Sequence, residues 1–273
     1  MSRGMLIDLT KCIGCRACQA ACKQWNELSA ETTHNGGSYQ NPPRFSDKTW
    51  TLVTFNEVET QAKFAWVFAK RQCMHCEHPA CASVCTVGAL HKTAEGPVLY
   101  DAGKCIGCRY CQYACPFGVP SFEWQNTFSL IRKCTMCANR QAEGLEPACA
   151  KACPTGAIRF GEREELLAEA RSRIAAQPEG YINHIYGEDE VGGTSIMYMS
   201  AVPFAQLGFP ELGDQPVTQA AENIMQQTPT IAIGVAAVAS GLYWVLKRRQ
   251  QQATAKTAEA ATDKGTKREG EKS

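Results

Sequence analysis

Short apolar runs separated by polar loops dominate the first 180 residues of the chain. Leu6–Leu9 predicts a strand, and Ala17–Leu28 predicts a short helix. Ser29–Lys48 contains closely spaced Gly and Pro residues, which indicates a loop insertion. Trp50–Phe55 and Phe64–Lys70 are rich in β-branched and aromatic residues and flank a polar stretch, which predicts a hairpin. This mixture of short strands and helices predicts an α+β fold.

Later segments continue this pattern up to about residue 180. Gly96–Asp101 predicts another strand. Gly161–Gln177 has acidic residues in its first turn, basic residues near its end and apolar residues on one face. It therefore predicts an amphipathic helix that covers the preceding domain. Residues 181–228 show little periodicity, and we expect an extended segment that wraps the domain or contacts a partner.

The C-terminal part contains one long apolar run, Pro229–Leu246, without a charged residue. At about 1.5 Å per residue it is long enough to cross the hydrocarbon core of a bilayer, although a buried core helix is an alternative. Lys247, Arg248 and Arg249 follow at once, whereas residues 210–229 contain no Lys or Arg. This asymmetry predicts a cytoplasmic C-terminus and a domain on the outer face. Residues 247–273 predict a disordered cytoplasmic tail.

Composition adds one anomaly to this picture. The formal net charge of +1 does not favour nucleic acid as the main partner. The 16 cysteines, however, fall into four groups of four with none left over. The groups are Cys12, Cys15, Cys18 and Cys22; Cys73, Cys76, Cys81 and Cys85; Cys105, Cys108, Cys111 and Cys115; and Cys134, Cys137, Cys149 and Cys153.

The spacing within these groups indicates iron–sulfur ligands. Cys105–Pro116 reads CIGCRYCQYACP, which is the C-x2-C-x2-C-x3-C-P run typical of bacterial iron–sulfur proteins. Disulfides are the weaker alternative, because frameworks of that kind belong to short secreted domains. Structural zinc is also weaker, because zinc sites usually combine two separate CxxC halves. The four groups repeat a ligand loop, a short helix and a strand, so we expect two ferredoxin-like dicluster modules.

In such a run the fourth cysteine reaches the neighbouring cluster, so the groups must pair. The two middle groups are close in sequence, which favours pairing them and leaves the outer groups, within 1–28 and 130–160, as the second module. The alternative pairs the first group with the second and must close the insertion Lys23–Gln72 inside one module. Nested pairing predicts the ligand sets Cys73, Cys76, Cys81 with Cys115; Cys105, Cys108, Cys111 with Cys85; Cys12, Cys15, Cys18 with Cys153; and Cys134, Cys137, Cys149 with Cys22.

Residues near the ligands receive secondary roles. No cysteine is missing from a set, so we interpret His75 and His78 as supporting or surface residues and not as ligands. Basic residues beside the ligands could offset cluster charge or be ordinary surface; they are Lys11, Arg16, Lys104, Arg109, Arg132 and Lys133. The aromatic residues Tyr110, Tyr113, Phe117 and Trp124 are expected to shield clusters from water. The sequence contains no nucleophile–base motif, P-loop or GxGxxG, so we predict electron transfer without catalysis.

Several motifs together resemble the iron–sulfur (beta) subunit of respiratory, membrane-bound formate dehydrogenase. They are LIDLTKCIGCRACQAACKQWNE, QCMHCEHPACASVC, KCIGCRYCQYACPFGVP, RKCTMC, EPACAKACPTGAIRFG and VGGTSIMYM, and the match runs from about Leu6 to Ser200. Thr86 departs from the pattern, which has proline there. The resemblance implies four [4Fe–4S] clusters, the nested pairing, and a subunit that is not an enzyme by itself.

The resemblance also implies partners and a location. The partners are a molybdenum- or tungsten-pterin subunit that oxidises formate and a haem b membrane subunit that delivers electrons to quinone. The location is the bacterial inner membrane, with the cluster domain of residues 1–180 on the periplasmic side. The N-terminus has neither an apolar signal region nor twin arginines, so we expect export on the catalytic partner's signal. Alternatives are the equivalent subunit of a membrane hydrogenase or another pterin oxidoreductase, or an independent membrane polyferredoxin.

Overall fold

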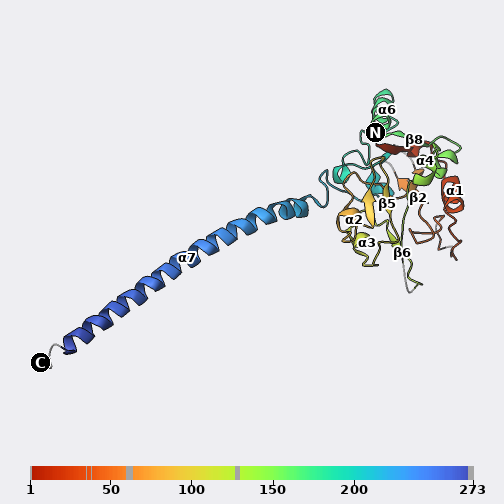
Figure 1. Cartoon of the computed structure of the whole chain (residues 1–273). Coiled ribbons are helices and arrows are strands. Elements are labelled where there is room, and N and C mark those ends of the chain that lie inside the picture. Colours follow the sequence, from red (N-terminus) through yellow and green to blue (C-terminus); the bar gives the residue numbers. More distant parts are fainter. Residues whose placement is uncertain (1, 35, 38, 60–63, 127–129, 270–273) are drawn as a thin grey trace. The chain divides into compact units, whose positions relative to one another are not determined.

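The computed structural model describes residues 2–34, 36, 37, 39–59, 64–126 and 130–269, with only the backbone for 257–269. The chain forms two units, Met1–Thr218 and Gln219–Ser273. The first unit contains the cysteine groups, and the second is a single long helix (Figure 1).

A three-stranded sheet organises the first unit. Its order is β8 (Ile158–Glu162), β1 (Arg3–Asp8) and β9 (Ile196–Met199), with β1 antiparallel to β8 and parallel to β9. The predicted strand at Leu6–Leu9 is therefore confirmed, although it begins and ends earlier. In Figure 1, β8 lies beside the N-terminus. The central strand thus joins the start of the cluster domain to its end.

Alternation along β1 places apolar side chains on both faces of this sheet. Leu6 packs with Leu166 and Leu167 of α6 (Arg163–Ala176), which confirms the predicted covering helix. Met5 and Ile7 face the opposite side and belong to the main core. Because both faces are covered, the strand is almost entirely removed from water.

The remaining strands form three separate hairpins. β2 (Leu52–Glu59) pairs with β3 (Phe64–Arg71), as predicted, but the ladder extends through Asn56–Glu59, which we expected in the connection. Residues 60–63, within the predicted connection, lie outside the described residues. The two shorter hairpins are β4 (Leu90–Lys92) with β5 (Val98–Tyr100), and β6 (Ser121–Phe122) with β7 (Ile131–Arg132).

Short helices carry the ligand groups. The helix predicted at Ala17–Leu28 is α1 (Ala17–Trp25), which contacts α5 (Ala148–Lys151), whereas α2 (Ala80–Ser83) contacts α3 (Tyr110–Ala114). These contacts bring the first cysteine group to the fourth and the second to the third. The fold is thus an α+β arrangement of two ferredoxin-like modules. The other helical segments of this unit are η1 (Leu9–Lys11), α4 (Ala138–Ala142), η2 (Glu190–Gly192) and η3 (Phe204–Leu207).

Residues 181–218 are integrated into the domain, where we expected an extended segment that wraps it or contacts a partner. The structure buries Tyr186, Phe204 and Phe209 in the main core and adds β9 to the sheet. The open edge of β1 offers hydrogen-bonding groups, and the apolar run Ile196–Met199 has no polar face to present to water. The compact unit therefore ends at Thr218 and not near residue 180.

The second unit is α7 (Gln219–Glu269), which contains Pro229. Within the described residues it provides one candidate membrane span, Gln219–Lys256, with a mean hydropathy of 1.7 over its most apolar window. The tail after Leu246, which we predicted to be disordered, is helical as far as Glu269. Its many Ala, Lys, Glu and Gln residues have high helix propensity, which outweighs the low hydrophobicity of the tail.

The close contact of β1 with β9 makes Gly4 a sensitive position. A Cβ at this residue would lie 2.5 Å from the backbone oxygen of Ser195, and neither backbone can move without disturbing the sheet. We predict that Gly4→Ala destabilises the folded protein by about 1–3 kcal/mol, measured as a lower melting temperature. Gly213→Ala is the control, since a Cβ there meets open space. Equal melting temperatures for the two variants would contradict the proposed crowding.

Candidate metal centres

The cysteines line small cavities in sets that combine distant groups. Three cavities are each lined by four cysteines, namely Cys12, Cys15, Cys18 and Cys153; Cys22, Cys134, Cys137 and Cys149; and Cys85, Cys105, Cys108 and Cys111. In the remaining set, the Cys76 thiol lies within electrostatic range of Cys73, Cys115 and Cys81. Across the described residues, no three His, Cys, Asp or Glu side chains converge on a point suited to one metal ion.

Backbone geometry shapes the two CIGCR loops in the same way. Gly14 and Gly107 have positive φ values of 68° and 71°, and Arg16 and Arg109 adopt the left-handed conformation just before α1 and α3. A positive φ turns successive amide groups toward the inside of a loop. The amide N–H of Gly107 accordingly donates to the Sγ of Cys105 at 3.4 Å. The repeated sequence therefore produces a repeated ligand cradle.

The fourth group uses the same kind of donor. The amide N–H of Met136 donates to the Sγ of Cys134 at 3.3 Å, and Met136 and Cys137 both have positive φ values. Cys22 of the first group lines the same cavity, and its Sγ accepts a hydrogen bond from the side-chain amide of Asn26 at 3.7 Å. Hydrogen bonds of this kind favour the thiolate form of a cysteine, which is the form that ligates iron.

Burial opposes ionisation of the same thiols. Desolvation raises the pKa of Cys18 to about 12 and that of Cys22 to about 11. Desolvation likewise raises the pKa of Cys81 to about 12, whereas hydrogen bonds from Thr155 and nearby amides outweigh desolvation and lower the pKa of Cys153. Buried thiolates need a compensating positive charge, which ferric and ferrous ions supply. All-cysteine sets in small, dry cavities with amide donors therefore fit iron–sulfur clusters.

Sulfurs of neighbouring sets also interact electrostatically. Cys18 is near Cys149, Cys134 is near Cys73, and Cys81 is near Cys111. These three contacts join the four sets in series. The two sets at the ends contain Cys15 and Cys108, both of which are exposed, whereas each cysteine of the two inner sets is buried or half-buried. The series therefore has two accessible ends and a covered middle.

His75 is a supporting residue inside the second group. It is fully buried, and its Nδ1 accepts the amide hydrogen of Val98 at 2.9 Å, so in the neutral ring Nε2 carries the proton. Burial, together with the nearby cation Lys133, lowers the pKa of His75 well below its usual value. His78 is exposed on the surface. His75 is therefore a buried supporting residue and His78 a surface residue, and these are the two roles that the sequence analysis allowed.

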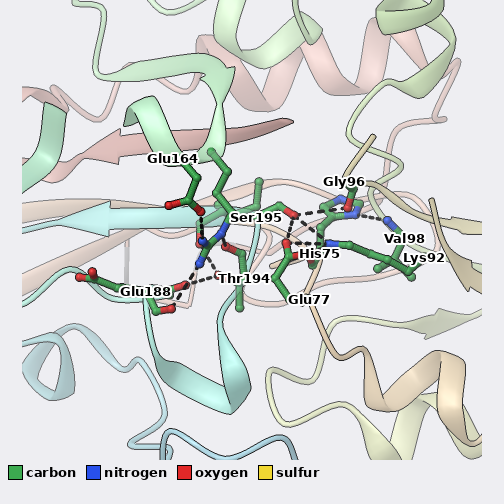
Figure 2. Close-up of polar contacts among 12 residues, drawn as sticks. His75, Glu77, Lys92, Gly96, Val98, Glu164, Glu188, Thr194 and Ser195 are labelled. Atoms are coloured by element: carbon green, nitrogen blue, oxygen red, sulfur yellow. Dashed lines mark hydrogen bonds and ion pairs between the residues drawn. The ribbon is translucent and has the colours of Figure 1, made fainter. Parts of the chain in front are cut away.

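Figure 2 shows how a polar network holds the loop around His75. Lys92 Nζ donates to the backbone oxygen of His75 at 2.9 Å, to Glu77 Oε1 at 2.9 Å and to Ser195 Oγ at 3.0 Å. Ser195 immediately precedes β9, so the network ties the second cysteine group to the central sheet. The contacts leave the histidine little freedom to turn.

Some of the basic and aromatic residues near the ligands have contacts or exposure that differ from the roles expected from the sequence. Arg16 stacks on Phe55 at 4.7 Å, and the equivalent Arg109 stacks on Phe122 at 4.3 Å and on Trp124 at 4.4 Å from the ring centroids. The predicted shielding role is wrong for Tyr110, Tyr113 and Trp124. Tyr110 and Tyr113 lie on the short helix α3, which turns them toward solvent, and Tyr113 is 86% exposed; Trp124 follows β6 and is more than half exposed. Phe117 is half-buried and packs against the core.

One residue near the ligands escaped the sequence reasoning. Lys70 is 1% exposed and lines the cavity that contains Cys12, Cys15, Cys18 and Cys153. A lysine at the end of a strand usually keeps its charge in water, so composition alone favours a surface position. Lys70 pairs with Val53, a buried residue on the inner face of the hairpin. This pairing is the signal that could have indicated that the lysine is buried.

Comparisons with known proteins agree with this geometry. Two family models, each described as a 4Fe-4S dicluster domain, match residues 11–89 and 64–163. A protein of Nitratidesulfovibrio vulgaris is 41% identical over 263 residues, covering 95% of this chain and 70% of that protein. The "Formate dehydrogenase, nitrate-inducible, iron-sulfur subunit" of Escherichia coli is 44% identical over 197 residues, covering 71% of this chain but only 66% of that subunit.

A further relative carries a different name. The "Hydrogenase-2 operon protein HybA" of Shigella flexneri is 35% identical over 280 residues, covering 90% of this chain and 84% of that protein. The dicluster domains and the 16 cysteines correspond to four [4Fe–4S] clusters. Such clusters, when bound, each exchange one electron at a time. The chain therefore belongs to a family of 4Fe-4S dicluster iron–sulfur proteins whose members include relatives named for formate dehydrogenase and for a hydrogenase operon, and it is an electron-transfer protein and not a catalytic subunit.

Proposed function

We propose that this chain carries electrons from a molybdenum- or tungsten-pterin subunit that oxidises formate to a haem b membrane subunit and quinone. The observation that carries the proposal is the series of four cysteine sets with one exposed ligand at each end, Cys15 and Cys108. A protein that passes electrons between two partners needs an accessible site for each of them. An independent electron store would need only one.

The proposed ligand assignment follows the nested pairing. The cavities support three of the sets, and the contacts of Cys76 support the fourth. The order along the series is then the set of Cys12, the set of Cys134, the set of Cys73 and the set of Cys105. In this assignment Cys115 of the third group completes the set that contains Cys73. The protein's own contribution is to hold these ligands in register and to keep water from the two inner sets.

Cysteine variants test this assignment. We predict that Cys115→Ala damages the cluster held mainly by Cys73, Cys76 and Cys81, because that cluster loses one of its four ligands. EPR spectra of the reduced protein should lose one signal, and iron analysis should show a loss of up to about four iron atoms per chain.

The matched controls are Cys111→Ala and Cys85→Ala. Nested pairing places these two residues on one cluster, so both variants should lose the same EPR signal, and that signal should differ from the one lost in Cys115→Ala. If Cys111→Ala and Cys115→Ala lost the same signal, the interleaving of the groups would be wrong.

Purification of the intact complex in mild detergent tests the proposed partners. We expect a stable assembly that contains a pterin subunit, about 16 iron atoms from this chain, molybdenum or tungsten, and haem b. It should reduce quinone when formate is added. A single chain without a pterin partner would instead support an independent polyferredoxin, and zinc in place of iron would exclude cluster binding.

A hydrogenase complex is the second candidate. The relative named as a hydrogenase operon protein favours this candidate. Its match covers 90% of this chain, whereas the match to the formate dehydrogenase subunit covers 71%. Ligand loops of this type are not specific for the partner's substrate. The identity of the large subunit that co-purifies separates the two candidates, since a hydrogenase subunit contains neither molybdenum nor tungsten and the complex would reduce quinone with hydrogen.

We also propose that α7 anchors the chain in the bacterial inner membrane, with the cluster domain on the periplasmic side. The basic residues Lys247, Arg248 and Arg249 directly after the apolar run support this orientation. Exposed aromatic side chains of Tyr243 and Trp244 at the end of the run suit a membrane interface.

Protease treatment of intact spheroplasts tests the orientation. We predict that protease digests the cluster domain while an antibody epitope at the C-terminus remains protected, because only the periplasmic side is accessible. Lysed spheroplasts provide the control, in which both parts are digested. A cluster domain that remains intact until lysis would reverse the proposed orientation.

A further inference from the structure

Lys70 is a buried cation without an acidic partner. Its side chain lies near the end of β3, is 1% exposed, and donates a short hydrogen bond from Nζ to Oε1 of Gln72. Among the residues that the structure describes, no Asp or Glu forms an ion pair with it. Burial of an ammonium group is costly unless a negative charge compensates it. The compensating charge must therefore come from elsewhere in the site.

The surroundings of Lys70 identify that charge. The residue lines the cavity of Cys12, Cys15, Cys18 and Cys153, and Cys18 is one of its electrostatic neighbours. Its other cysteine neighbours are Cys149 and Cys134, which line the adjacent cavity. Lys70 also acts electrostatically on Cys22 and Cys137, which complete that second set. The ammonium thus lines the first cavity, and its acceptor Gln72 Oε1 lies 4.0 Å from the Sγ of Cys149 in the second set, so cysteines of both sets are within its electrostatic range.

We propose that Lys70 is the shared counter-cation of these two clusters and raises the reduction potential of both. This inference rests on the ligand assignment proposed above. When bound, each cluster would accept one electron from the preceding donor in the series, so its net charge would become more negative by one, while no bond forms or breaks. A fixed positive charge in a dry environment stabilises the reduced form more than the oxidised form. The residue acts through its charge and does not ligate iron.

Two other lysines near the ligands differ from Lys70 in position or in burial. Lys133 is buried and forms no ion pair among the described residues, but it lines none of the three cysteine cavities and donates to the backbone oxygens of Val98 and Cys134. Lys104 precedes the ligand Cys105 directly, yet its side chain is 59% exposed and forms an ion pair with Asp101. Water screens such a charge strongly. Lys104 is therefore a suitable control for proximity to a ligand without burial.

Redox titration monitored by EPR tests the proposal on the purified complex, or on the detergent-solubilised chain if it is isolated alone. Lys70→Met should lower the midpoint potentials of the two clusters whose signals are lost in Cys18→Ala and Cys149→Ala. The cluster of Cys105, Cys108 and Cys111, at the far end of the series, should keep its potential. Lys70→Arg should restore both potentials, and Lys104→Met should leave all four unchanged.

Two results would overturn the proposal. One is an unchanged pair of potentials in a Lys70→Met protein that retains its iron; the other is an equal shift in Lys70→Arg, which would indicate packing and not charge. If Lys70→Met fails to hold four clusters, Gln72→Glu replaces it, since a carboxylate at the existing acceptor neutralises the ammonium. The cluster of Cys12 must then shift to a lower potential, and an unchanged value rejects the proposal. These readouts need no formate, so they remain decisive if the proposed partner is wrong.

Discussion

The pairing of β1 with β8 is the constraint on which the site depends. These two strands are separated by about 150 residues, yet Ile7 lies opposite Ile158 and each strand is adjacent to a cysteine group. Met5, Leu6 and Ile7 are tightly packed against neighbours on the two faces of the sheet, and this packing holds the register because a shift by one residue would force both faces to repack. The closure brings Cys12 and Cys153 to the same cavity.

Charge balance is the second constraint. Sixteen cysteines require a dry interior that nevertheless tolerates many negative sulfurs. Amide groups turned inward by residues such as Gly107 and Met136 provide part of the compensation. A buried cation provides a longer-range contribution. Stability of the domain and tuning of its clusters are therefore linked, since the same buried groups serve both.

The exposed ligands and the stacks of arginine on aromatic rings lie at the two ends of the series of cysteine sets. Cys15 and Cys108 are exposed, and each lies in a loop whose arginine, Arg16 or Arg109, stacks on aromatic residues. These stacks stiffen the edges of the loops without covering the ligands. Electron transfer to a partner requires close approach, and a firm, accessible edge permits it. The inner sets, by contrast, are surrounded by core residues.

Local sequence was sufficient to predict the candidate ligands and the elements that carry them. The spacing of Cys105, Cys108, Cys111 and Cys115 depends only on loop geometry, and the apolar run after Pro229 depends only on length and composition. Tertiary structure decided what distant segments do together. The neighbours of Cys22 and Cys115, the insertion of Ile196–Met199 beside β1 and the burial of Lys70 all arise from packing between segments far apart in the chain. A lysine indicates the surface when it is read locally, and an apolar run does not indicate which strand it pairs with, because burial and pairing depend on the neighbours that the fold supplies.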